Sequence, residues 1–205
     1  DGYEAVFIGS GAGLPQFLHI PGENLLGVYS ANELLTRVNL MKAYRDDYDT
    51  PIKHFHRVAV VGAGNVAMDA ARCAKRMGAE KVYIVYRRGE AEMPARLEEQ
   101  HHAKEEGIEF MTLTNPVEIL GGEDGRVNGM KCIKMELGEP DAKGRRKPIG
   151  TGKFETIEVS AVIGAIGQKV DLGGIAPEGM TFNKNGTIIA DAVTLQTSQP
   201  DVFVG

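Results

Sequence analysis

Residues 57–77 read Arg-Val-Ala-Val-Val-Gly-Ala-Gly-Asn-Val-Ala-Met-Asp-Ala-Ala-Arg-Cys-Ala-Lys-Arg-Met. The stretch opens with an unbroken apolar run, Val58 to Val61, which is typical of a strand buried on both faces of a parallel sheet. A Gly-Ala-Gly turn follows, and then a helical pattern that Gly78 closes. The expected packed face of this helix consists of Val66, Ala70, Ala74 and Met77. Strand, glycine turn and helix in this order are the context that a dinucleotide-binding fingerprint requires.

Each position of the turn has a physical role in this hypothesis. Gly62 permits the sharp turn out of the strand, and Gly64 lacks a Cβ, so that a pyrophosphate can approach the backbone. Ala67 stands where a third glycine is usual and keeps the helix close to the sheet. The helix N-terminus then offers unpaired N–H groups to the phosphates. Tight turns also use glycine for structural reasons alone, and it is the flanking strand and helix that favour dinucleotide binding.

A second strand is expected over residues 81–86, with Arg87 and Arg88 at its carboxyl end. NAD-binding domains usually end this strand with Asp or Glu, which holds the ribose 2′-hydroxyl. Guanidinium groups instead match a 2′-phosphate, which a carboxylate would repel. A solvated charge pair is the simpler alternative, but the position in the unit predicts that these arginines select NADP(H).

The rest of the chain is predicted to continue this α/β pattern and then to change to hairpins. Pro15 argues against a helix after Gly9–Gly13, so this glycine-rich segment is expected to be a strand-to-loop exit. Further strands are expected at 3–8, 108–113, 161–167 and 201–205, and helices are expected from Ser30 to about Tyr48 and from Met93 to Gly107. A meander is expected with strands at 117–120, 127–137 and 154–159, the last two joined by a polar loop up to Gly152. A hairpin is expected around Asn185-Gly186.

Composition excludes several classes of function. The 205 residues are 42% hydrophobic and 25% charged, and the net charge of −5 argues against a nucleic-acid partner. Cys73 and Cys132 lack CxxC spacing and a histidine cluster, which predicts no metal site and a reducing, cytoplasmic location. No segment has the length of a membrane span, and no signal peptide is present. The ends at Asp1 and Gly205 suggest a piece of a longer polypeptide.

Three segments carry a specific resemblance: residues 60–72, residues 85–96 with Val-Tyr-Arg-Arg-Gly-Glu-Ala-Glu-Met-Pro-Ala-Arg, and residues 105–110. They resemble the small, β-subunit-type chain of bacterial NADPH-dependent glutamate synthase and its relatives, which include NADP-binding subunits of electron-bifurcating transhydrogenase and sulfide dehydrogenase. The opening and closing segments resemble the crossings from and into the FAD domain of that family, with Gly9-Ser10-Gly11 where the family usually has Ala-Thr-Gly.

The resemblance implies a three-layer, Rossmann-like α/β domain of the FAD/NAD(P)-binding kind, with a parallel sheet and a β-meander. It implies a crossover segment with a helix at 1–56, an NADP(H)-binding domain at 57–167, and a return segment at 168–205. The implied cofactor-binding residues are Gly62, Gly64, Asn65, Val66 and Ala67 at the pyrophosphate, Arg87 and Arg88 at the 2′-phosphate, and Ala165, Ile166 and Gly167 near the nicotinamide.

The implied reaction is hydride transfer from NADPH to FAD in a neighbouring domain of the same parent chain. Electrons would then pass through Fe–S clusters to a large synthase subunit or another acceptor. The family's FAD fingerprint and Fe–S cysteines are absent here, so neither cofactor is assigned to this chain, no catalytic residue is expected, and the isolated chain should bind NADPH without turnover. Two alternatives remain: a non-catalytic nucleotide-binding module, and another branch of reductases, which a CxxC pair in the parent chain would mark. The sequence leaves open the terminal electron acceptor, the direction of electron flow and the oligomeric state.

Overall fold

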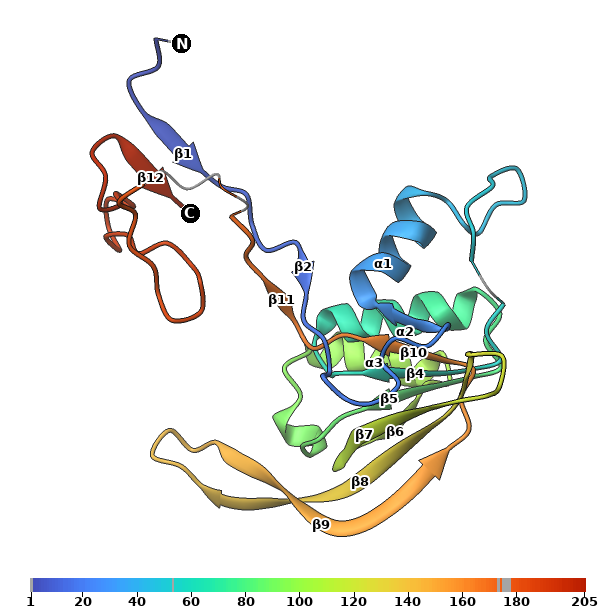
Figure 1. Ribbon diagram of the computed structural model, residues 1–205. Helices are drawn as coiled ribbons and strands as arrows, with labels where there is room; N and C mark the ends of the chain where they lie inside the picture. The colour runs from blue at the N-terminus through green and yellow to red at the C-terminus, as the bar shows by residue number, and fades with distance from the viewer. Residues whose placement is uncertain (1, 53, 173, 175–177) are drawn as a thin grey trace. The chain divides into compact units, whose positions relative to one another are not determined.

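The computed structural model describes residues 2–52, 54–172, 174 and 178–205. The chain divides into two compact units, one made of residues 1–15 with 167–205 and the other of residues 16–166. The glycine turn lies in the second, larger unit (Figure 1). The three-part domain division expected from the resemblance stays a prediction.

The larger unit is built on a five-stranded sheet in which every neighbouring pair is parallel. Its strands, in spatial order, are β3 (Val28–Ser30), β10 (Ala161–Gly164), β4 (Arg57–Val61), β5 (Lys81–Val85) and β6 (Glu109–Met111). The predicted returning strand is therefore confirmed, because β10 inserts between β3 and β4. The sheet places the carboxyl ends of β4, β5 and β10 at one edge.

Three α-helices cover one face of this sheet, as Figure 1 shows. They are α1 (Ala31–Leu35), α2 (Asn65–Arg76) and α3 (Leu97–Glu105), with a π-helical turn η1 (Thr36–Leu40) after α1 and a 3₁₀ turn η2 (Glu90–Glu92) before α3. Within the described part of the chain, none of these helices has the length and apolar character needed to cross a membrane.

A three-stranded antiparallel meander covers the opposite face. It consists of β7 (Thr114–Gly121), β8 (Val127–Pro140) and β9 (Arg146–Ile157). The predicted meander is confirmed, but the expected polar loop up to Gly152 is wrong, because β9 already begins at Arg146. The sequence of β9 lacks an apolar alternation, and its residues are mostly exposed in the structure. The segment is a strand because it pairs with β8.

Alternating side chains of the central strands build two cores, one on each face of the sheet. Val58 and Val60 of β4 pack with Ile84 and with the alanines of α2, while Ala59 and Val61 face the meander. The meander contributes Met130 to the second core, and its side chain is fully buried. Helices, parallel sheet and meander are therefore the three layers of the predicted α/β fold.

An ion-pair network joins helices α2 and α3. Arg72 contacts Glu99 at 3.0 Å and Glu106 at 2.8 Å, and Arg76 contacts Glu106 at 2.6 Å. The hydrogen bond from Arg76, together with Arg72, holds the pKa of Glu106 below its usual range. These contacts fix the far end of α2 and leave its N-terminus to the glycine turn.

The helix that starts at the Ser30 cap is shorter than predicted. Ser30 accepts a hydrogen bond from the Glu33 N–H at 3.1 Å, as a capping residue should. The helix nevertheless ends at Leu40 rather than near Tyr48, because a π-helical turn brings the Met41 N–H to a carbonyl five residues back, and Lys42 adopts a left-handed φ of 52°. The chain then leaves helical geometry.

Two structural corrections affect residues near the glycine turn. Helix α3 begins at Leu97 and not at Met93, which is extended (φ −68°, ψ 127°) as is favoured before a proline. Val66, expected on the packed face of α2, is 46% exposed because it lies on the first turn, beyond the edge of the sheet.

The smaller unit contains a parallel pair, β1 (Val6–Ile8) with β12 (Val202–Val204), and an antiparallel pair, β2 (Leu14–Pro15) with β11 (Gln168–Lys169). Residues 9–13 leave β1 as a loop that leads into β2 and not into a helix, as predicted. The predicted hairpin around Asn185-Gly186 is confirmed by an antiparallel bridge between Phe182 and Ile188. The hydrophobic core of the smaller unit is small. Its buried residues are Ile8, Met180 and Ile188, and it lies beside a hollow of about 420 Å³.

Candidate dinucleotide-binding site

Gly62 makes the turn out of β4, and the fold itself requires a glycine there. Its φ is 133°, a conformation that side chains disfavour. A Cβ at this position would lie 2.3 Å from the carbonyl oxygen of Ala165, which follows β10. The Gly62 N–H donates to the Val85 carbonyl at 3.0 Å, so the turn is also tied to the end of β5. Gly62 therefore brings the ends of three strands together.

Gly64 is a glycine for a different reason. It is the N-cap of α2, with φ −84° and ψ 177°, which any residue can adopt. A Cβ there would have no neighbour closer than the Pro94 Cγ at 4.0 Å. The fold thus leaves open space at Gly64 that a side chain would fill, and this space fits the close approach of a pyrophosphate.

The N-terminus of α2 beside Gly64 has unsatisfied donors. No side chain caps the helix, and Ala67 and Met68 are the first residues whose N–H groups donate to the Gly64 carbonyl, at 3.0 and 3.2 Å. Within the described residues, the N–H groups of Asn65 and Val66 have no acceptor. Ala67 is buried, as the fingerprint predicts for the position that packs helix against sheet. Free N–H groups and the positive end of the helix dipole favour an anion here.

The segment after β5 is held rigidly at the same edge of the sheet. Tyr86 donates its N–H to Met111 and accepts from the Thr114 N–H, both at 3.0 Å, and the Arg88 carbonyl accepts from the Leu113 N–H at 2.9 Å. Leu113 reaches this position through a left-handed φ of 49°. The backbone that carries the two arginines is therefore fixed by the start of the meander.

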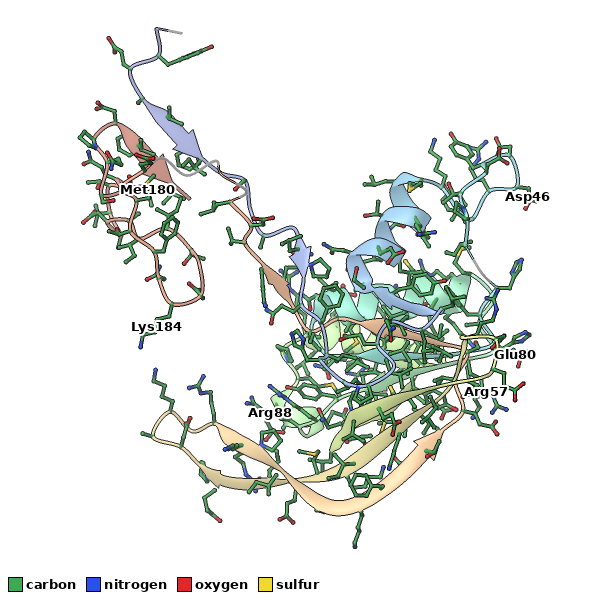
Figure 2. The ribbon with its side chains drawn as sticks, viewed as in Figure 1. Asp46, Arg57, Glu80, Arg88, Met180 and Lys184 are labelled. Carbon is green, nitrogen blue, oxygen red and sulfur yellow. The ribbon has the colours of Figure 1, made fainter. Side chains whose placement is uncertain are left out.

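The two arginines present their side chains differently. Arg87 is exposed, whereas Arg88 is half-buried, and its Nε is buried without a hydrogen-bond partner among the described residues. Figure 2 shows Arg88 at one end of the larger unit, opposite Arg57 and Glu80, which mark the amino ends of β4 and β5. The arginines thus lie at the carboxyl edge, where ligands bind in open α/β sheets. Guanidinium groups at this edge can form charge-assisted hydrogen bonds with an anion.

The predicted nicotinamide segment begins at this edge. Ala165 donates its N–H to the Val61 carbonyl at 2.8 Å, and its own carbonyl lies against Gly62. Ile166 is partly exposed, and Gly167, with φ 108°, belongs to the smaller unit. The larger unit thus brings together the glycine turn, the arginines and Ala165, while the role of residues 165–167 toward a cofactor stays a prediction.

The cysteines are separated by the sheet. Cys73 packs against the helix-side core and Cys132 lies in the meander-side core, so the two thiols cannot form a disulfide with each other. Burial raises the pKa of Cys73, and it raises the pKa of Cys132 to about 12. Among the described residues, no group of histidine, cysteine or acidic side chains could hold a metal ion.

Sequence reasoning missed two contributors to this site. One is Leu113, whose left-handed backbone anchors the arginine segment. The other is the non-helical segment 93–96, which is hydrogen-bonded to Ala63 of the glycine turn and to Asn65 at the start of α2. The Met93-Pro94 pair was the available signal, because a residue before proline avoids helical geometry.

The chain is similar to known proteins over nearly its whole length. The chain is 41% identical over 208 residues to the NADP(+)-dependent formate dehydrogenase subunit beta of Moorella thermoacetica, a match that covers 99% of this chain and 28% of that protein. It is 35% identical over 211 residues to the glutamate synthase (NADPH) small chain of Escherichia coli, covering 99% of this chain and 45% of that protein. The predicted resemblance is confirmed, and the chain spans less than half the length of these relatives.

Among solved structures, Mycobacterium tuberculosis FprA in complex with NADPH matches with a TM-score of 0.76 and 22% identity, over 98% of this chain and 57% of that chain. This likeness shows that the FAD/NAD(P)-binding fold is shared. A family model described as pyridine nucleotide-disulphide oxidoreductase matches residues 1–205. The chain therefore belongs to the pyridine nucleotide-disulphide oxidoreductase family.

Proposed function

We propose that this chain is the NADP(H)-binding part of a flavoprotein oxidoreductase of the glutamate synthase small-chain kind. The observation that carries this proposal is the open space at Gly64 beside the uncapped N-terminus of α2, at the edge that also holds Arg87 and Arg88. Each feature alone has structural explanations, but together they match a diphosphate with an added 2′-phosphate.

The pyrophosphate is assigned to residues Gly62, Gly64, Asn65, Val66 and Ala67. In this arrangement the free N–H groups of Asn65 and Val66 donate to phosphate oxygens. Gly64 permits the approach, while Gly62 and Ala67 hold the turn and the helix in place. The helix dipole adds roughly 0.3–1 kcal/mol of attraction for an anion at this position.

The 2′-phosphate is assigned to Arg87 and Arg88. The partly exposed Arg88 supports this assignment, because a guanidinium group gains a charge-assisted hydrogen bond when a phosphate arrives. Burial raises the pKa of Tyr86, whose hydroxyl stays protonated and donates to the Glu92 carbonyl at 2.8 Å. No carboxylate follows the strand directly, which supports selection of NADP(H) over NAD(H).

When NADPH is bound, it supplies a hydride to FAD in the neighbouring domain, and this chain positions the nicotinamide. Residues 165–167 are assigned to the nicotinamide end, because Ala165 leaves β10 at the same edge as the glycine turn. The domain division into a crossover segment with a helix at 1–56, an NADP(H)-binding domain at 57–167 and a return segment at 168–205 belongs to this proposal, with the smaller unit, residues 1–15 and 167–205, as the segments that lead from and to the FAD domain. Exposure of Val6 and Phe7 on β1 supports it, since parallel sheets are normally covered on both faces.

The electron acceptor is assigned to other parts of the parent protein. The relatives are named for glutamate synthase and for formate dehydrogenase, although both match 99% of this chain. A shared NADP(H)-binding part with different acceptors, reached through Fe–S clusters and a large subunit or another partner, accounts for this pattern. An origin in a bifurcating transhydrogenase or sulfide dehydrogenase is the alternative for the parent. The two free cysteines support the proposed cytoplasmic location.

Chemical-shift mapping of the ¹⁵N-labelled chain tests the site assignment with fragments of the cofactor. Adenosine 2′,5′-bisphosphate should shift the amides of residues 62–67 and 87–88, nicotinamide mononucleotide those of residues 165–167, and NADP⁺ both sets. Shifts confined to other residues would contradict the assignment. The chain with NADPH should fail to reduce ferricyanide, and a yellow preparation that carries flavin and turns over would contradict the proposed division of labour.

A further inference from the structure

Residues Met93 to Arg96 form a non-helical segment, here called the strap, that is hydrogen-bonded to the glycine turn and to the start of α2. The Ala95 N–H donates to the Ala63 carbonyl at 3.1 Å, and the Arg96 N–H donates to the side-chain Oδ1 of Asn65 at 2.9 Å. The second bond joins residues 31 positions apart and uses the first residue of α2. The strap is thus fastened to the turn at two successive peptide units.

Other contacts hold the strap from its far side. The buried Gln100 of α3 donates its Nε2 to the Ala95 carbonyl at 2.9 Å, and the Tyr86 hydroxyl donates to the Glu92 carbonyl at 2.8 Å. Met93 and Ala95 are buried, so the strap is part of the core and not a free loop. Its conformation therefore depends on a few specific hydrogen bonds in addition to packing.

The strap forms one wall of the open space at Gly64. Pro94, between the two buried residues, is the nearest neighbour of the missing Cβ, with its Cγ 4.0 Å away. The width of the slot between Gly64 and Pro94 is set by where the strap lies. Outward movement of the strap would replace a preformed slot by an open surface.

We propose that Asn65 acts as a positioning residue, a latch whose side-chain oxygen fixes the strap and so preforms the phosphate slot. This inference rests on the proposed nucleotide-binding function. It gives the Asn65 side chain a role distinct from that of the Asn65 backbone N–H, which is assigned to the phosphate. The Oδ1 atom is already occupied by the Arg96 N–H, and without it that N–H would lose its partner. The rival role is that of a direct phosphate ligand through Nδ2.

Replacing Asn65 separates the two roles when strap opening and affinity are measured on the same protein. The reporter of opening is the Ala95 amide, whose acceptor on Ala63 the substitution does not touch, followed by hydrogen exchange without nucleotide. Asn65→Ala should leave the strap closed in only about a fifth of the molecules, so that the Ala95 amide loses its protection and NADPH and NADH bind about fivefold more weakly, since only the closed strap offers the slot. Asn65→Asp retains the acceptor oxygen and should leave the Ala95 amide protected.

Asp124→Ala is the matched control. It also removes a side-chain oxygen that accepts from a backbone N–H, that of Arg126 at 3.1 Å, but in the turn between β7 and β8. It should change neither the Ala95 protection nor nucleotide affinity, and thermal melting checks that all variants fold.

Three results would overturn the proposal that Asn65 positions the strap. The first is weaker binding by Asn65→Ala with Ala95 still protected, which identifies Asn65 as a direct ligand. The second is loss of protection with unchanged affinity, and the third is loss of protection in Asn65→Asp. Failure of the unmodified chain to bind either nucleotide would instead overturn the proposed function, and this inference with it.

Discussion

Replacing Gly62 and Gly64 by alanine, one at a time, separates the glycine that the fold needs from the glycine that the nucleotide needs. At Gly62 the new Cβ would lie 2.3 Å from the Ala165 carbonyl oxygen, and the residue would have to adopt a φ of 133°. A left-handed backbone costs a side chain about 1–2 kcal/mol and overpacking about 1–3 kcal/mol, so unfolding free energy should fall by about 2–5 kcal/mol. This is a large part of the stability of an ordinary domain.

Gly64→Ala should have the opposite profile. Its φ of −84° suits alanine, and the nearest atom to the new Cβ is 4.0 Å away. The loss of conformational entropy in the unfolded chain, worth about 0.4–1 kcal/mol, offsets the poorer N-cap, so stability should stay within about 0.5 kcal/mol. A phosphate in the slot would meet the Cβ, at a cost of about 1–3 kcal/mol, or roughly 5- to 150-fold in affinity.

The assays are urea unfolding followed by circular dichroism, and NADPH titration of each folded variant. Gly64→Val extends the series, because its larger side chain should abolish binding while the helix remains. A folded Gly64→Val variant with unchanged affinity would refute the placement of the phosphates. A Gly62→Ala variant as stable as the unmodified chain would refute the close approach of β10.

Three further predictions concern charge and burial. Replacing Arg87 and Arg88 together by Gln should remove most of the preference for NADPH over NADH and leave NADH affinity nearly unchanged, as parallel titrations would reveal; an equal loss for both cofactors would contradict the 2′-phosphate assignment. The Arg76 hydrogen bond depresses the pKa of Glu106, so this carboxylate stabilises the fold above the ordinary glutamate pKa of about 4.3 and loses that contribution as the pH falls through its folded-state pKa. Glu106→Gln should therefore lower the unfolding free energy at pH 7 and flatten the acid limb of a curve of stability against pH. An unchanged curve would refute a role of the ion-pair network in acid stability. Burial raises the pKa of Cys132 to about 12, so its thiol should react with a thiol reagent at pH 8 only on unfolding, and fast modification in the native chain would contradict the meander-side core.

The central βαβ unit could be predicted from sequence because local rules determine it. The apolar run of β4, the glycine turn and the helix that ends before Gly78 follow from burial, backbone freedom and capping within about 20 residues. The same rules identified the Ser30 cap. They placed the arginines at the carboxyl end of β5, where the structure also has them.

The parts that sequence did not reveal depend on contacts between distant residues. The polar residues of β9 become a strand through pairing with β8, and Leu113 becomes left-handed to hold the Arg88 carbonyl. The strap at residues 93–96 is held in place by Asn65 and Ala63, which accept its N–H groups. Propensity alone gives no information on such partners. The expected helix start at Met93 was four residues early although the following proline is a local signal against it.

Titration of the unmodified chain with NADPH and with NADH, side by side at one ionic strength, tests the central claim most directly. Calorimetry would give both affinities without a flavin or an electron acceptor. We expect one site per chain and binding of NADPH about tenfold or more tighter than of NADH, from charge-assisted bonds to the 2′-phosphate. Equal affinity for the two cofactors, or no binding of either, would contradict it.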